Sequence, residues 1–149
     1  MDDEPASKDM RHASAGWLIQ RLSRRFEAAM QTALRPHGLE LGQFALLMAV
    51  LESDGLTQTE LGTIFAMPAW KISRYLDGME AAGLVRRAAD PTSRRTHRIH
   101  ACAAARALAP RVRAAANGVN AGMLEALAPD ERAQLVALLQ RVVVPGERF

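Results

Sequence analysis

Apolar residues recur along most of this chain at intervals of three and four residues, the spacing that gives an α-helix one buried face. One such stretch runs from 14 to about 35, and a second, from 41 to 51, is apolar on almost every side. The pattern returns from 104 to 127, where Pro110 is expected to kink or restart the helix. A last helix is predicted to begin at Pro129. The chain is therefore predicted to be mostly α-helical.

Two shorter helices are predicted between the second and third of these stretches. Thr57 and Glu60 have the spacing of a capping box, in which a hydroxyl and a carboxylate satisfy backbone donors at a helix start. A helix is thus predicted to begin near Gln58. Pro68 has the fixed φ that suits a first helical turn, so a second helix is predicted to start near it. The predicted core-facing residues are Leu61, Ile64 and Phe65 of the first helix and Ile72, Leu76 and Met79 of the second.

Two short strands, at 84–85 and 96–101, are predicted after the second helix. An Asp-Pro pair marks a turn between them. The region from 83 to 100 contains five arginines and one acid, and Arg94 and Arg95 are predicted to project from the end of the turn. Two helices followed by a basic β-hairpin are typical of a winged helix-turn-helix, a unit that places one helix in a DNA groove.

The outward face of the second helix is the candidate DNA-binding surface. Its residues are Ala69, Trp70, Lys71, Ser73 and Arg74. Thr57 and Gln58 are candidate phosphate contacts at the start of the preceding helix. Arg94 and Arg95 suit a phosphate backbone or a narrow minor groove. A solvated helix face is the alternative for Lys71 and Arg74. For Trp70 two interpretations stay open, contact with a thymine methyl group or a sugar and packing between helices.

Four ordered motifs together resemble the MarR family of bacterial transcription regulators. They are QTELG at 58–62, KISRYLDGME at 71–80, GLVRR at 83–87 and DPTSRR at 90–95. The resemblance is strongest from about 40 to 108. It implies a homodimer, in most members a repressor, whose second helix reads the major groove and whose wing arginine enters the minor groove. It also implies that a small, often aromatic or phenolic, ligand or an oxidant lowers the affinity for DNA.

The resemblance also implies a domain layout. We expect a mobile N-terminal segment at 1–11 and a single MarR-like domain at 12–149, with the winged helix-turn-helix at about 40–100. The dimerisation helices are expected at about 13–35 and 102–145, because helices that bury little against a small winged domain need another surface. Two-fold DNA readers present their recognition helices about 34 Å apart. A pseudo-palindromic operator is therefore expected.

Three positions depart from the family's pattern. Ser93 stands where the family usually has an aspartate, so the carboxylate that commonly braces the wing arginine is missing. Cys102 stands where threonine usually precedes the next helix, and cysteine is a poor helix cap. Trp70 is a large aromatic residue where small hydroxylated residues are common.

By resemblance, an effector pocket lies where the first, second and long fifth helices meet the winged domain. The candidate lining residues are Trp17, Arg21, Phe44, Met48 and Arg113, each of which is also compatible with an ordinary core or interface role. Cys102 is a candidate oxidant sensor, and a small buried side chain is the alternative. The four histidines show no metal-ligand spacing, so no metal site is expected.

Composition narrows the class of protein. A chain of 149 residues with 49% apolar content is expected to form one domain, and its net charge of +3 matters less than where the charge lies. One cysteine, no membrane-spanning apolar run and no signal-peptide layout predict a cytoplasmic protein without membrane contact. We expect neither an enzyme nor a cofactor, because the sequence has no Gly-rich phosphate loop and no suggestive catalytic constellation. The alternatives are a winged-helix protein-interaction module without sequence-specific DNA binding, and a redox-responsive regulator acting through Cys102.

Overall fold

The computed structural model describes residues 9–143; most of the segment predicted to be mobile lies outside this range, and residues 9–12 have helical backbone. The helices are α2 (Ala15–Leu34), α3 (Leu41–Glu52), α4 (Gln58–Phe65), α5 (Ala69–Ala81), α6 (Ala103–Met123) and α7 (Pro129–Val143). The strands are β1 (Leu56–Thr57), β2 (Val85–Asp90) and β3 (Ser93–Ala101). The predicted fold class, mostly helical with a small β-hairpin wing, is confirmed. None of the helices in the described part of the chain is long and apolar enough to cross a membrane.

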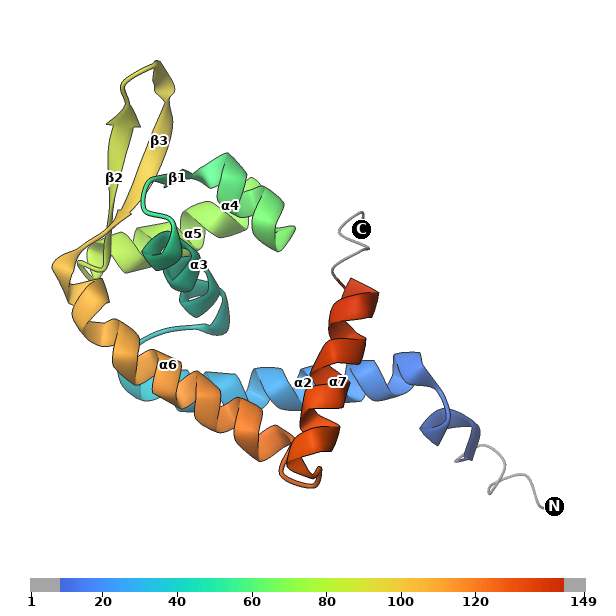
Figure 1. Cartoon of the computed structure of the whole chain (residues 1–149). Coiled ribbons are helices and arrows are strands. Elements are labelled where there is room, and N and C mark those ends of the chain that lie inside the picture. The colour runs from blue at the N-terminus through green and yellow to red at the C-terminus, as the bar shows by residue number, and fades with distance from the viewer. Residues whose placement is uncertain (1–8, 144–149) are drawn as a thin grey trace.

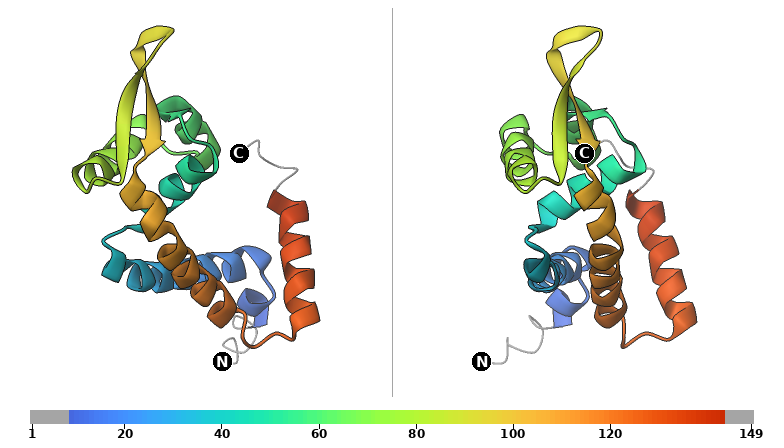
Figure 2. Two further views of the ribbon diagram at one scale, coloured as in Figure 1. Left: turned by 60° about the vertical axis from the view of Figure 1, so that its left-hand side comes forward. Right: turned by 90° about the vertical axis from the view of Figure 1, so that its left-hand side faces the viewer.

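The molecule has two ends (Figure 1). At one end α3, α4, α5 and the sheet form a winged helix-turn-helix, and the β2–β3 hairpin projects from it. At the other end α2 and α6 cross, and α7 stands beside them. The views in Figure 2 show that the hairpin tip points away from α2 and α7. Since α6 begins where β3 ends, this helix connects the two ends.

The core lies where α3 and α5 meet the sheet and the two long helices. Ile72, Leu76 and Met79 are each fully buried, as their spacing predicts. Its other large, fully buried side chains are Met30, Leu34, Leu46, Leu47, Val50, Leu61, Val85, Ile99 and Val112. The prediction that Ile64 faces the core is wrong, since this side chain is 56% exposed. It lies at the edge of the short helix α4, where it lines an open hollow with Met48.

The sheet is larger than predicted. Its order is β1-β3-β2, and the unpredicted strand β1 pairs Leu56 with Ile99. β2 extends to Asp90 and β3 begins at Ser93, so the turn is reduced to two residues. The strands extend past the apolar positions because backbone pairing stabilises a hairpin whose side chains stay in water. Sequence periodicity reports burial, and it therefore shows only the buried base of the hairpin.

The two C-terminal helices differ in how they are covered. α6 continues through Pro110 as one helix, so it does not restart there. Pro110 and Arg106, the residue whose carbonyl loses its helical partner, are both exposed to water. α7 buries none of its residues. Its exposed large apolar side chains are Val136, Leu138, Leu139, Val142 and Val143. A surface of this kind is typical of an interaction site.

A glycine allows α3 and the recognition helix α5 to lie in contact. A Cβ atom at Gly42 would overlap the ring of Tyr75, which is 7% exposed. We expect Gly42→Ala to lower the free energy of unfolding by about 1–3 kcal/mol, the typical cost of overpacking. Urea unfolding measures this effect. Gly118→Ala in α6 is the matched control, because a Cβ there meets nothing within 4 Å. Equal stability of the two variants would contradict the close packing of the two helices.

Candidate nucleic-acid interface

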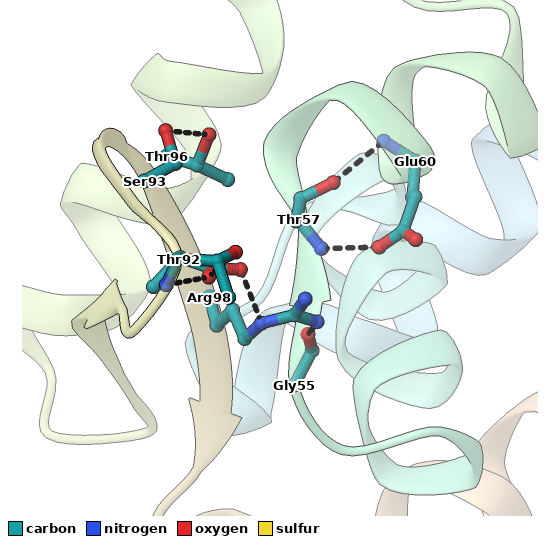
Figure 3. A network of polar contacts seen from close by, with 8 residues as sticks. Gly55, Thr57, Glu60, Thr92, Ser93, Thr96 and Arg98 are labelled. Atoms are coloured by element: carbon teal, nitrogen blue, oxygen red, sulfur yellow. Dashed lines mark hydrogen bonds and ion pairs between the residues drawn. The ribbon is translucent and has the colours of Figure 1, made fainter.

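The start of α4 has the predicted capping box (Figure 3). The backbone N–H of Glu60 donates to the Thr57 hydroxyl at 3.1 Å, and the Thr57 N–H donates to the Glu60 carboxylate at 2.7 Å. The Thr57 N–H thereby holds the pKa of Glu60 below its ordinary value. Because this N–H is occupied, Thr57 can offer a phosphate only the proton of its hydroxyl. Gln58, half-buried, is the first residue of α4.

The turn between α4 and α5 places one helix face outward. Ala66 has a left-handed backbone with φ 49°, and Pro68 caps α5 in an extended conformation. At 3.6 residues per turn, Trp70 and Arg74 fall on the side of α5 opposite its buried residues. Ala69, Trp70 and Arg74 are exposed, and Lys71 and Ser73 lie half-buried at the flanks. Trp70 is 68% exposed, so within the described chain it does not pack between helices.

The two cations of this face rest against Tyr75. The Arg74 guanidinium lies 4.8 Å from the centre of the Tyr75 ring, and the Lys71 ammonium 5.9 Å from it. Arg74 also forms an ion pair with Glu40 at 3.3 Å, with side chains 57% and 48% exposed. An ion pair this exposed contributes at most about 1 kcal/mol. Arg74 is therefore oriented by its neighbours and can still exchange Glu40 for a DNA group.

Arg87 has a structural role that the charge count did not reveal. Its guanidinium pairs with Asp77 at 2.8 Å and with Glu80 at 2.7 Å, and its side chain is only 17% exposed. It also donates to the Ser73 carbonyl. The Arg87 N–H, followed by its guanidinium, lowers the pKa of Glu80. Arg87 therefore attaches β2 to α5 and neutralises two acids on the recognition helix. From the sequence alone, Arg87 counts only toward the positive charge of the hairpin region.

Arg98 connects the hairpin to the start of β1. Its Nε donates to the buried carboxylate of Asp90 at 2.7 Å, and its guanidinium donates to the Gly55 carbonyl at 2.9 Å (Figure 3). The Thr92 hydroxyl and N–H donate to the same aspartate at 2.6 Å and 2.8 Å. These two bonds, with a smaller effect of Arg98, lower the pKa of Asp90. The wing is thus attached to the segment that leads into α4.

Asp90 should make the free energy of unfolding depend on pH. Because its folded-state pKa is lowered, its contribution is complete above the ordinary aspartate pKa of about 4 and is lost as pH falls through the lowered value. We expect the urea midpoint to fall with pH below about 4, and to fall less steeply in Asp90→Asn. Parallel pH profiles of the two proteins would show that Asp90 is not coupled to folding.

The wing arginines lie in an irregular part of the hairpin. The regular ladder ends where Ala89 pairs with His97, and the next pair joins Asp90 to Ser93. Arg94 and Arg95 therefore lie in a bulge of β3, and both are exposed. The prediction had them project from the end of the turn, ahead of a strand at 96–101; the structure places them inside β3, which already begins at Ser93. A bulge redirects the side chains that it carries.

Ser93 does not take over the bracing role of the family's aspartate. It accepts a hydrogen bond from the Thr96 hydroxyl at 3.1 Å (Figure 3). Within residues 9–143 no ion pair holds Arg94 or Arg95. Both guanidinium groups are available to an outside anion.

The structure does not gather the candidate effector residues in one place. Trp17 and Arg21 lie together, with the guanidinium 5.3 Å from the indole ring, and line a hollow formed by α2 alone. Met48 lines a different hollow, between α3 and α4. Phe44 packs partly buried against the core, and Arg113 is exposed on α6. A pocket that includes all five would need a further wall or a different conformation.

Cys102 lies at the junction of β3 and α6. It is half-buried and caps α6 without a side-chain hydrogen bond, as expected for cysteine. Two nearby basic side chains contact Asp54: His100 Nδ1 lies 2.7 Å from its carboxylate, and Arg106 forms an ion pair with it at 3.7 Å. The hydrogen bond from His100 is the main cause of a lowered pKa at Asp54. His97 is exposed on β3.

Known proteins share this sequence pattern and fold. The MarR family model matches residues 37–96. The HTH-type transcriptional repressor Rv2887 of Mycobacterium tuberculosis is 28% identical over 130 residues, which cover 87% of this chain and 94% of the relative. The structure of Rv2887 in complex with salicylic acid superposes with a TM-score of 0.72 and covers 87% of this chain and 96% of that chain.

Two further structures are similar over most of their length. The probable transcriptional regulator of Pseudomonas aeruginosa has a TM-score of 0.81 at 28% identity, covering 89% of this chain and 98% of that chain. A mutant MarR from E. coli complexed with operator DNA has a TM-score of 0.78 at 22% identity, covering 86% of this chain and 92% of that chain. At that identity the second likeness shows a shared fold.

Proposed function

Because this chain belongs to the MarR family of transcription regulators, we propose that it is a homodimeric repressor that binds a pseudo-palindromic operator in double-stranded DNA. The family consists of regulators and not of enzymes. In this proposal α5 enters the major groove and the wing contacts the phosphate backbone or the minor groove. The protein acts in the cytoplasm, where its operator lies.

The outward face of α5 is the observation that carries the proposal. Arg74 lies beside an exposed Trp70 and Lys71 at the edge of the same face, while Ile72, Leu76 and Met79 on the other side of the helix are fully buried. Arg87 compensates the charge of Asp77 and Glu80, the two acids of α5 itself. Arg94 and Arg95 extend the positive surface along the hairpin. A surface of this composition complements phosphates and base edges.

The long terminal helices support the homodimer. α7 buries no residue, and Leu18 and Ile19 of α2 are 45% and 54% exposed. Apolar surface of this extent is best covered by the same helices of a second copy, since symmetric dimers are the commonest oligomers. The dimer would carry two copies of α5 and thereby read two half-sites.

Selection of bound duplexes from a random DNA pool tests the proposal. The expected winner is a two-fold-symmetric sequence whose half-sites are one helical turn apart. Analytical ultracentrifugation should show two chains on each bound duplex. A pool without enrichment would contradict the proposal and favour the alternative, a winged-helix module that binds protein.

Release by a small aromatic acid is the regulatory part of the proposal. It is supported by the relative Rv2887, whose structure contains salicylic acid. The proposed effector contacts are Trp17, Arg21, Phe44, Met48 and Arg113, which do not share one pocket in this structure and would have to come together in the ligand-bound conformer. A ligand weakens DNA binding only as far as it prefers a conformer unsuited to DNA. Salicylate titrated into the protein–operator complex should raise the apparent dissociation constant, and Arg21→Ala should reduce this effect. An unchanged constant at saturating salicylate would exclude that ligand.

Cys102 supports a redox variant of the same regulation. The residue lies at the junction of β3 and α6, where a bulky oxidised sulfur would displace the winged unit from the long helices. Peroxide should then weaken operator binding by the wild type and not by Cys102→Ser. Full peroxide sensitivity of the serine variant would show that Cys102 is not the oxidant sensor.

A further inference from the structure

Trp70 is the largest apolar side chain on the outward face of α5. It is the second residue of the helix and is 68% exposed. At 3.6 residues per turn it shares its side of the helix with Arg74, one turn further along. The buried residues Ile72, Leu76 and Met79 occupy the other side. An indole in this position has no structural role within the described chain, and its exposure to water is unfavourable.

The position of Trp70 indicates that DNA, and not the partner subunit, contacts the exposed indole. The exposed apolar residues that suit a dimer lie on α2 and α7, at the end of the molecule opposite the hairpin tip (Figure 2). Trp70 instead lies at the N-terminal end of the recognition helix. Recognition helices of helix-turn-helix proteins contact base edges with their N-terminal residues.

The apolar ring and the single N–H donor of indole limit which base it can contact favourably. Tryptophan has a large apolar ring and one N–H donor, and it has no acceptor. In the major groove thymine alone presents a methyl group beside an acceptor, its O4 atom. Cytosine presents a hydrogen-bond donor, and the indole has no acceptor to receive that bond. Guanine presents acceptors without a methyl group, and adenine pairs its acceptor with a donor.

We propose that Trp70 reads a thymine in each operator half-site, with its ring against the C5-methyl group. This inference rests on the proposed function and adds a specificity-determining residue to it. Trp70 and Arg74 are four residues apart, which is about 6 Å along the helix axis. The thymine and the base or phosphate that Arg74 contacts therefore lie within about two base pairs of each other.

Replacing thymine by deoxyuridine tests the methyl contact, because the change removes only the methyl group. In the selected operator each thymine is replaced singly, and the dissociation constant of the wild type is measured. Burial of one methyl group corresponds to a factor of about four in affinity. We expect a loss of about this size at one thymine of each half-site. At that position Trp70→Ala should bind the thymine duplex and the deoxyuridine duplex equally, and Trp70→Phe should keep part of the difference between them.

Two results would overturn the inference. One is a wild type indifferent to every deoxyuridine substitution, and the other is Trp70→Ala with the full thymine preference. Because Trp70 is exposed, both variants should unfold at the same urea concentration as the wild type, which separates an effect on DNA recognition from an effect on folding. A pool that yields no operator is a different failure, since it refutes the proposed function on which the inference rests.

Discussion

Replacing Arg94 and Arg95 together with alanine is expected to weaken binding to the selected operator and to a scrambled duplex by similar factors. Both side chains are exposed on the wing and lack an ion pair within residues 9–143. Log affinity falls with log salt concentration, and each phosphate that is no longer neutralised by an arginine makes this negative slope shallower by about 0.9. Four such phosphates in a dimer complex would make the slope shallower by about 3.6, and would lower the affinity near 0.15 M salt by on the order of a thousandfold. Fluorescence anisotropy at several salt concentrations measures both quantities.

A matched control variant shows whether the loss of DNA affinity depends on where the two arginines lie or only on the charge removed. Arg24 and Arg25 are also adjacent and exposed, and they lie on α2, far from the hairpin. Their double replacement removes the same charge, but it should change the salt slope little. If the two double variants behaved alike, total charge would explain binding and the wing would have no special role.

Arg74→Ala is expected to act on sequence discrimination. A cation on the outward face of α5 that makes a bidentate contact with guanine contributes about 1–3 kcal/mol. Both subunits lose the contact, so the variant should lose about five- to 150-fold in affinity for each operator half-site, and much less for scrambled DNA. The ratio of the two dissociation constants, measured at one salt concentration, isolates this effect.

Glu40 supplies the control for this variant. Its carboxylate forms the ion pair with Arg74 at 3.3 Å. Glu40→Gln removes the competing charge and keeps Arg74, so operator affinity should stay equal or rise. Loss of operator affinity in Glu40→Gln as large as in Arg74→Ala would mean that the ion pair positions the arginine. Equal operator affinity of Arg74→Ala and the wild type would remove Arg74 from the base-reading surface.

The helix starts of the winged unit were predictable because their signals are local. Thr57 and Glu60 are three residues apart, and they form the capping box. Pro68 caps α5, whose buried residues follow from simple spacing. Tyr75 was missed although it lies on the same helix face, and the fit of Gly42 against it depends on two separate helices. Local spacing therefore predicts elements better than it predicts how they pack together.

The features that sequence reasoning missed depend on distant partners. β1 pairs with a strand more than forty residues away, Leu56 with Ile99. Arg87 and Arg98 resemble the other hairpin arginines in sequence, and only the fold shows that they bind Asp77, Glu80, Asp90 and the Gly55 carbonyl. The candidate effector residues were placed by resemblance, and in the structure they do not share one pocket: Trp17 and Arg21 line one hollow and Met48 another. Their assignment stays a prediction.

The affinity ratio between the selected operator and a scrambled duplex distinguishes sequence-specific binding from binding through charge alone. It should be measured at physiological salt with the purified full chain, by anisotropy or calorimetry. We expect the operator to be bound at least about a thousandfold more tightly than the scrambled duplex, as is typical of sequence-specific regulators. A ratio near one would contradict this expectation, because the exposed face of α5 and the wing would then bind DNA only through charge.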